Sequence, residues 1–96
     1  MAVYVDKLVD YSWRHGPSCH LIADSVEELM TFAIAMGLRP EWFQPKSSPH
    51  FDLTAYARAN AVKNGAIELE RRAFVIKLRE LRSKREEILK WSATLK

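Results

Sequence analysis

The segment DSVEELMTFAIAMGL, residues 24–38, constrains the fold more than any other part of the chain. Ser25 and Glu28 have the spacing of a helix capping box, and the apolar residues that follow recur every three or four positions. Gly37 is the residue type that most often ends a helix in the left-handed conformation. We therefore predict a helix over residues 26–36 with one buried face.

Segments on both sides of this helix predict short strands, because they are rich in β-branched and aromatic residues. The predicted strands are Val3–Asp6, His20–Ala23 and Trp42–Gln44. If the second and third strands are parallel, they form a right-handed βαβ unit with the helix between them. Two further helices are predicted over 55–64 and from 69 to at least 82. The predicted fold class is α/β: a small three-stranded sheet with a βαβ unit and two further helices, the last one long.

The chain has 96 residues, too few for two independent cores, so we predict a single α/β domain over residues 1–96. Cys19 is the only cysteine, which rules out an internal disulfide. It is predicted to be inert and to point away from its neighbour His20, because adjacent strand residues face opposite ways. The N-terminal MAVYVDKLVD lacks the features of a signal peptide, and no apolar run could cross a membrane. We expect a cytoplasmic protein.

Basic residues are concentrated after Glu70, where ERRAFVIKLRELRSKREEILKWSATLK interleaves Lys and Arg with Glu. Interleaved signs are typical of a solvated helix rather than of a nucleic-acid-binding stripe, so nucleic acid is not the favoured partner. The apolar residues of this segment have a spacing close to a heptad; they are Phe74, Leu78, Leu81 and Ile88. This stripe has no evident cover in so short a chain. We therefore predict a homo-oligomer, with residues 70–96 as an oligomerisation element.

Four ionisable residues are the candidates for catalysis: Asp6, His20, His50 and Asp52. His50 and Asp52 share a face if their backbone is extended, and a His-x-Asp pair suits metal ligation or acid–base chemistry. Asp6 ends the first predicted strand. It joins Asp24 and Gln44 at one edge of the sheet if that strand is parallel to the others, and it faces His20 if that strand is antiparallel. Simpler roles stay open: His50 and Asp52 could only tie down a loop, and His20 could be an ordinary strand-edge histidine.

Residues around the SSPHFDLT segment are candidates for ligand binding. Ligands of open α/β sheets gather at the carboxyl ends of parallel strands, where Asp24 and Gln44 would lie, although Asp24 also suits an ordinary helix start. The free N–H groups after Thr54 favour an anion, and Trp42 or Trp13 could stack on a base. The predicted ligand-binding residues are Lys46, Ser47, Ser48, Thr54, Arg58, Trp42 and Gln44.

Six motifs occur in the order VYVD, HLIAD, EELMTFAIAMGL, WFQ, SPHFDLT and RANAVKNGAIEL. Their order and spacing resemble those of a small family of unknown function found in bacteriophages and bacteria. The resemblance covers residues 2–69 and excludes the tail that follows. It implies a bacterial cell as the setting, with the gene carried by a phage or by its host, and it assigns no activity.

Two functions would use these same residues. The first is binding of a small molecule that carries phosphate, such as a nucleotide, in a pocket lined by His and Asp. The second is catalysis by a small metal-dependent hydrolase or nuclease, with His50, Asp52, Asp6 and His20 as metal ligands or as acid and base. Binding is favoured, because the sequence spells out no complete set of metal ligands. The sequence assigns no cofactor, and a divalent metal ion is the one candidate.

Overall fold

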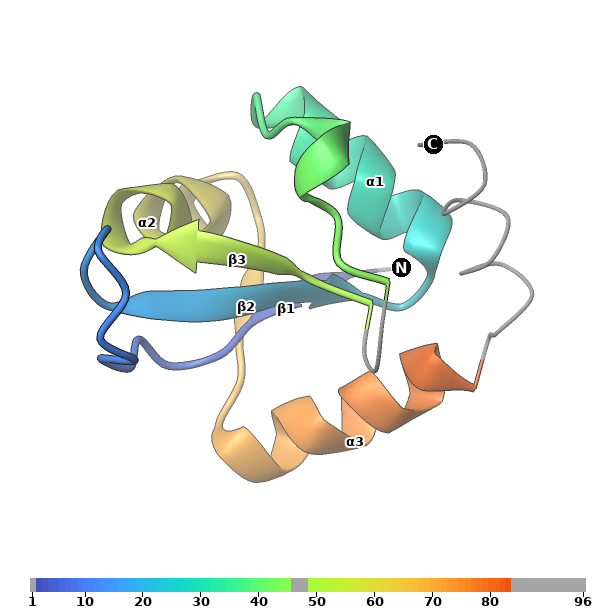
Figure 1. The fold of residues 1–96 in the computed structure, drawn as a ribbon. Coiled ribbons are helices and arrows are strands. Elements are labelled where there is room, and N and C mark those ends of the chain that lie inside the picture. Colours follow the sequence, from blue (N-terminus) through green and yellow to red (C-terminus); the bar gives the residue numbers. More distant parts are fainter. Residues whose placement is uncertain (1, 46–48, 84–96) are drawn as a thin grey trace.

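A computed structural model describes residues 2–45 and 49–83, and here a four-stranded sheet lies between helices on both faces (Figure 1). The strands are β1 (Val3–Val5), β2 (Ser18–Ala23), β3 (Phe51–Thr54) and β4 (Ile67–Glu68). The helices are α1 (Val26–Ala35), α2 (Ala55–Lys63) and α3 (Arg71–Arg82), with a short 3-10 turn, η1 (Pro40–Trp42). The α/β class is confirmed, and the sheet has a fourth strand where three were predicted.

The sheet is mostly antiparallel, with the strand order β3-β2-β1-β4. β2 runs antiparallel to both of its neighbours, and β1 and β4 are parallel. The predicted βαβ unit over His20–Gln44 is therefore wrong. Its supposed last strand is the end of η1 followed by an isolated bridge between Gln44 and His50. Pro40 begins the turn, because its fixed φ suits a helical start rather than a sheet interior.

The next strand along the chain after α1 is β3, which carries Asp52. Along β3, Phe51 and Leu53 are buried whereas Asp52 is exposed, which is the alternation of a strand with one face in the core. In the register of β2 and β3, His20 lies directly across from Asp52. Strand pairing therefore brings together two polar residues that are far apart in the sequence.

Helices α1 and α2 pack on one face of the sheet and α3 packs on the other (Figure 1). The ring centroid of His20 lies 6.3 Å from that of Phe74 in α3, so this histidine is on the α3 face. Its neighbours Cys19 and Leu21 point to the opposite face, since side chains alternate along a strand, and both are buried. The α1 and α2 face of β2 is therefore apolar at this level, while the α3 face carries the histidine.

The helix signals of the sequence are confirmed by hydrogen bonds at the helix starts. The Ser25 hydroxyl accepts from the Glu28 N–H at 3.1 Å, and the Thr54 hydroxyl accepts from the Ala57 N–H at 3.1 Å. Gly37 has a φ of +88°, the left-handed conformation that ends a helix. The Thr54 cap also fixes where β3 turns into α2, and so it sets the position of the polar residues just before it.

The apolar stripe of the last helix is covered within the chain. Phe74 and Leu81 belong to the core and Leu78 packs against it, while Ile88 lies outside the described residues. The α3 face of the sheet supplies the cover that the sequence alone does not reveal. Because these residues are already covered, they give no reason to expect that this part of α3 packs on another subunit. The homo-oligomer stays a prediction. Within residues 2–45 and 49–83, no helix has both the length and the apolar character to span a lipid bilayer.

Candidate functional site

Asp6 and His20 form a doubly hydrogen-bonded pair where β1 ends. The backbone N–H of His20 donates to Asp6 Oδ1 at 2.7 Å, and its ring Nδ1 lies 2.8 Å from Asp6 Oδ2. The pair forms because β1 and β2 are antiparallel, one of the two arrangements predicted for this residue. A carboxylate only accepts hydrogen bonds, so Nδ1 carries the proton and Nε2 is the nitrogen available to a ligand.

The hydrogen bond to Asp6 raises the pKa of His20 above its ordinary value. Partial burial opposes this shift, while the charges of Asp6 and Asp52 add to it. A metal ion competes with a proton for a histidine nitrogen, and a histidine with a raised pKa binds its proton more tightly. Metal binding at His20 is therefore expected to weaken as the solution becomes acidic.

His50 and Asp52 lie beside this pair. His50 Nε2 is 3.3 Å from Asp52 Oδ1, and the side-chain amide of Gln44 donates to Asp52 Oδ2. The ring centroids of His20 and His50 are 5.2 Å apart, with the ring planes inclined by 72°. These contacts link the four candidates for catalysis, and their catalytic role stays a prediction.

His20, His50 and Asp52 form a donor set that suits a divalent transition metal. One ligand atom from each residue lies within 4.8 Å of the other two. Donors at about 2.1 Å from one ion in a tetrahedral site are about 3.4 Å apart, so the most distant pair must approach by about 1.4 Å at most. Two imidazoles and a carboxylate are ligands of catalytic zinc and of iron(II) sites, where positions remain for water or substrate. In many metal sites a carboxylate outside the coordination shell accepts a hydrogen bond from a metal-bound histidine and orients it. Asp6 has this position relative to His20.

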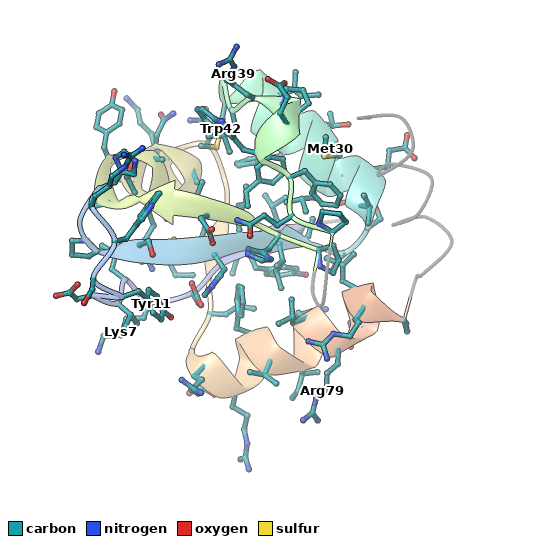
Figure 2. The ribbon with its side chains drawn as sticks, in the orientation of Figure 1. Lys7, Tyr11, Met30, Arg39, Trp42 and Arg79 are labelled. Atoms are coloured by element: carbon teal, nitrogen blue, oxygen red, sulfur yellow. The ribbon has the colours of Figure 1, made fainter. Side chains whose placement is uncertain are left out.

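A cleft of about 410 Å³ lies between the sheet and α3 at this cluster, and we name it the histidine cleft. Its walls combine apolar residues of α3 with polar residues, which are Asp6, His20, His50, Lys7 and Arg71. The ring of Tyr11, also in the wall, has its centroid 6.1 Å from that of His20. Figure 2 shows Lys7 and Tyr11 on the loop that follows β1. The cleft thus places two basic side chains near the two histidines.

A second cleft of about 660 Å³ adjoins the cluster at Asp52, and we name it the tryptophan cleft. Its polar and aromatic lining consists of Trp13, His15, Glu41, Trp42, Gln44, Asp52 and Thr54. Figure 2 shows Trp42, the last residue of η1, on the side of the sheet that carries α1 and α2. Trp42, Gln44 and Thr54, predicted to bind a ligand together with the histidines, therefore line a separate cleft.

Arg58 is the predicted ligand-binding residue that the structure places elsewhere. Its Nε donates to the Asp6 carbonyl oxygen at 2.8 Å, and its Nη1 lies 3.0 Å from Glu68 Oε1. Arg58 therefore ties α2 to the ends of β1 and β4, and it is not among the residues that line either cleft. Its guanidinium is held by these partners, and its predicted part in ligand binding stays a prediction. The predicted residues Lys46, Ser47 and Ser48 lie outside the described residues.

Asp24 and Cys19 have structural roles. Asp24 accepts a hydrogen bond from the Tyr4 hydroxyl at 2.8 Å, and Lys77 Nζ lies 3.6 Å from the same oxygen. This residue therefore joins β1, β2 and α3 far from the histidines. Burial, followed by the charge of Asp6, raises the pKa of the Cys19 thiol to about 12. A thiol with so high a pKa is a poor nucleophile at neutral pH.

Sequence reasoning missed three residues of the histidine cleft: Lys7, Tyr11 and Arg71. Lys7 directly follows Asp6, a candidate for catalysis, so its place in the sequence could have indicated that it lies near the site. Tyr11 lies in a loop of mixed composition, and Arg71 is one of many basic residues near the C-terminus. Only the packing of α3 against the sheet singles out Arg71 from the rest of that basic segment.

The fold and the site define an α/β protein with a histidine–carboxylate cluster between two clefts. The family described as "Protein of unknown function (DUF4031)" matches residues 3–81, and the chain belongs to this family. This match confirms the resemblance to a family of unknown function that the motifs indicated. No curated protein and no solved structure matched the chain. The matched range includes all four residues of the cluster.

Proposed function

We propose that this protein binds a divalent metal ion through His20, His50 and Asp52 and uses it to hydrolyse a phosphate ester. The observation that carries the proposal is the meeting of these three donors beside the β2–β3 pairing, with their ligand atoms within 4.8 Å of one another. Several ionisable groups that meet in a cleft indicate function more often than packing, since partial burial of such groups is costly.

Asp6 supports metal ligation by its position behind His20. A carboxylate that accepts the Nδ1–H of an imidazole stabilises the tautomer in which Nε2 carries a lone pair, and the 2.8 Å contact between Asp6 and His20 has this form. A histidine with a purely structural role needs one partner. His20 has both the Asp6 carboxylate and the ring of His50 as neighbours, which favours a site over a loop clamp.

The charge around the histidine cleft supports an anionic substrate. Lys7 and Arg71 line the cleft and are exposed, so they can approach a phosphate group without first losing much hydration. A divalent ion supplies Lewis-acid activation of water and of a phosphoryl oxygen. The two basic side chains stabilise negative charge on the phosphate, while Asp6 keeps the ring of His20 oriented.

Binding of a phosphate-bearing small molecule such as a nucleotide, without chemistry, is the second candidate. Lys7 and Arg71 favour it independently of any metal, because they attract phosphate through charge and hydrogen bonding alone. The two candidates differ in one requirement: hydrolysis needs the donor set of two histidines and a carboxylate, whereas simple phosphate binding does not.

Metal binding and hydrolysis are tested on protein stripped of metal with EDTA. Isothermal titration calorimetry with Zn²⁺ and Mn²⁺ is expected to give one site per chain. Hydrolysis of bis(p-nitrophenyl) phosphate is expected only after metal is restored. His50→Ala should lower metal affinity by more than about 100-fold, because even loss of an outer partner costs about 10–100-fold. His15→Ala is the matched control, since His15 is an exposed histidine outside the donor set.

Absence of metal binding by the wild-type protein would overturn the proposal, and so would equal metal affinity of His50→Ala and the wild type. If metal binds and AMP binds but no phosphate ester is hydrolysed, the second candidate replaces the first. The thermal midpoint of His50→Ala should stay within a few degrees of the wild type. A variant that unfolds instead would identify the histidine as a loop clamp.

The cellular setting and the assembly state are further proposals. A bacterial cytoplasm, with the gene carried by the host or by a phage, is supported by the motif resemblance and by the composition of the chain. A homo-oligomer stays a prediction that light scattering tests: a clean monomer mass at tens of micromolar would contradict it.

A further inference from the structure

Building on the proposed function, we infer that the substrate is a nucleotide whose base occupies the tryptophan cleft, and that this base carries an exocyclic amino group. Asp52 lines the tryptophan cleft and contacts His50, which lines the histidine cleft. The two clefts therefore adjoin at this pair. We place the flat aromatic end of the ligand in the tryptophan cleft and its phosphate end in the histidine cleft, beside the proposed metal ligands. The ligand would pass from one face of the sheet to the other at the edge strand β3.

Two indole side chains make the tryptophan cleft a stacking surface. Trp13 and Trp42 are 36% and 53% exposed, and both line the cleft. Leu38 and Ala57 add apolar surface. Indole faces stack on nucleobases of every kind, because each base presents a π face. The volume of about 660 Å³ lies in the range of small-molecule sites, about 300–1,000 Å³.

The charged residues in the lining of this cleft are two acids, whose carboxylates accept hydrogen bonds. Glu41 and Asp52 contribute carboxylates, and the Gln44 amide nitrogen donates to Asp52, which leaves the Gln44 carbonyl oxygen as another acceptor. Carboxylates accept hydrogen bonds from the exocyclic amine of a base. Lys7 and Arg71 in the histidine cleft attract phosphate, whereas the described residues that line the tryptophan cleft include no Lys or Arg. The division of charge thus sets the orientation of the nucleotide.

Nucleosides test the base site separately from the metal site, because they carry no phosphate and can be added to metal-free protein. Adenosine and purine riboside are the matched pair, since purine riboside lacks only the exocyclic amino group. Calorimetry and NMR of the indole N–H signals should show adenosine binding about tenfold more tightly than purine riboside. Ribose 5-phosphate should leave the signals of Trp13 and Trp42 unchanged, because it has no base.

Substitutions then assign the binding to the cleft. Trp13→Leu and Trp42→Leu should each weaken adenosine binding by about tenfold or more, because each removes a stacking face. Tyr56→Leu is the matched control, since Tyr56 is an 84% exposed aromatic residue that is not in the cleft lining, and it should have no effect. AMP should bind more tightly than adenosine, and Lys7→Ala should remove that gain.

The outcomes separate this inference from the proposed function. Metal-dependent hydrolysis without any nucleoside binding would overturn the inference and leave the proposed function standing. Equal affinity for adenosine and purine riboside would overturn the amino-group preference, and adenosine binding that survives both tryptophan variants would overturn the cleft as the base site. Adenosine binding that both tryptophan variants weaken, in a protein that binds no metal, would support the base site and overturn only the metal proposal.

Discussion

Asp6 and Asp24 each follow a strand of the same antiparallel pair, at its opposite ends, yet their surroundings differ. Asp24 accepts hydrogen bonds from the Tyr4 hydroxyl at 2.8 Å and from the Ala2 N–H at 3.0 Å, and Lys77 lies 3.6 Å away. Asp6 is paired with a histidine whose ring lines an open cleft. One carboxylate therefore joins three elements, while the other orients a group that can bind a ligand.

The partners explain this difference. A tyrosine hydroxyl, a backbone N–H and a lysine all keep their protons at neutral pH, so Asp24 stays charged and its contacts persist. Histidine changes its charge near neutral pH and is a common metal ligand. The position of an acid after a strand is therefore compatible with either role, and the partner that the fold supplies decides between them.

The largest expected effect at either carboxylate is that of Asp6→Asn on metal affinity. The amide keeps the shape of the side chain but loses the charge that holds the Nδ1 proton of His20. We expect the affinity for Zn²⁺ to fall by about 10–100-fold, the usual cost of losing an outer carboxylate. Titration calorimetry on metal-free protein measures this effect. Asp24→Asn is the matched control at the other end of the strand pair, and equal losses in both variants would remove the distinction.

Asp24→Ala should affect stability rather than metal binding. It leaves the Tyr4 hydroxyl and the Ala2 N–H without their acceptor. We expect the free energy of unfolding to fall by about 1–3 kcal/mol, the typical cost of an unsatisfied and partly buried group. Urea denaturation measures the loss, and Zn²⁺ affinity should match that of the wild type. A variant as stable as the wild type would mean that these contacts contribute little.

The smallest expected effect is on the pH dependence of stability in metal-free protein. Burial opposes the charge of Asp24, but the Tyr4 hydroxyl, Lys77 and the Ala2 N–H outweigh burial and lower its pKa. The resulting stabilisation is present above the unfolded pKa of 3.8 and is lost as pH falls through the lower folded value. The pKa of His20 is raised, so its stabilisation is present below 6.5 and is lost as pH rises through the folded value.

Urea denaturation at a series of pH values separates these two contributions. Asp24→Asn should flatten the stability profile in the acid range and leave the part near pH 6.5 unchanged. Asp6→Asn should flatten the part near pH 6.5, because it removes the partner that raises the pKa of His20. If Asp24→Asn also flattened the part near pH 6.5, the two carboxylates would be coupled, and the view of them as independent ends of the strand pair would be incorrect.

The three helices were predictable because their signals are local. The cap at Ser25, the cap at Thr54 and the left-handed Gly37 involve residues within a few positions of one another, so the chain needs no distant partner to define them. The strands were harder to assign. Phe51–Thr54 contains a polar residue and follows a proline-rich stretch, which favoured a loop, and only its pairing with β2 makes it a strand.

The sequence by itself determined the helices, the α/β class and the adjacency of His50 and Asp52, because each depends on spacing along the chain. The tertiary structure decided which groups join that pair. The register of β2 against β3 sets His20 across from Asp52, and the antiparallel pairing of β1 with β2 brings Asp6 to His20. The packing of α3 on the sheet adds Arg71 to the cleft. Such contacts join distant parts of the chain, and their free energy comes from burial and strand pairing that no local pattern specifies.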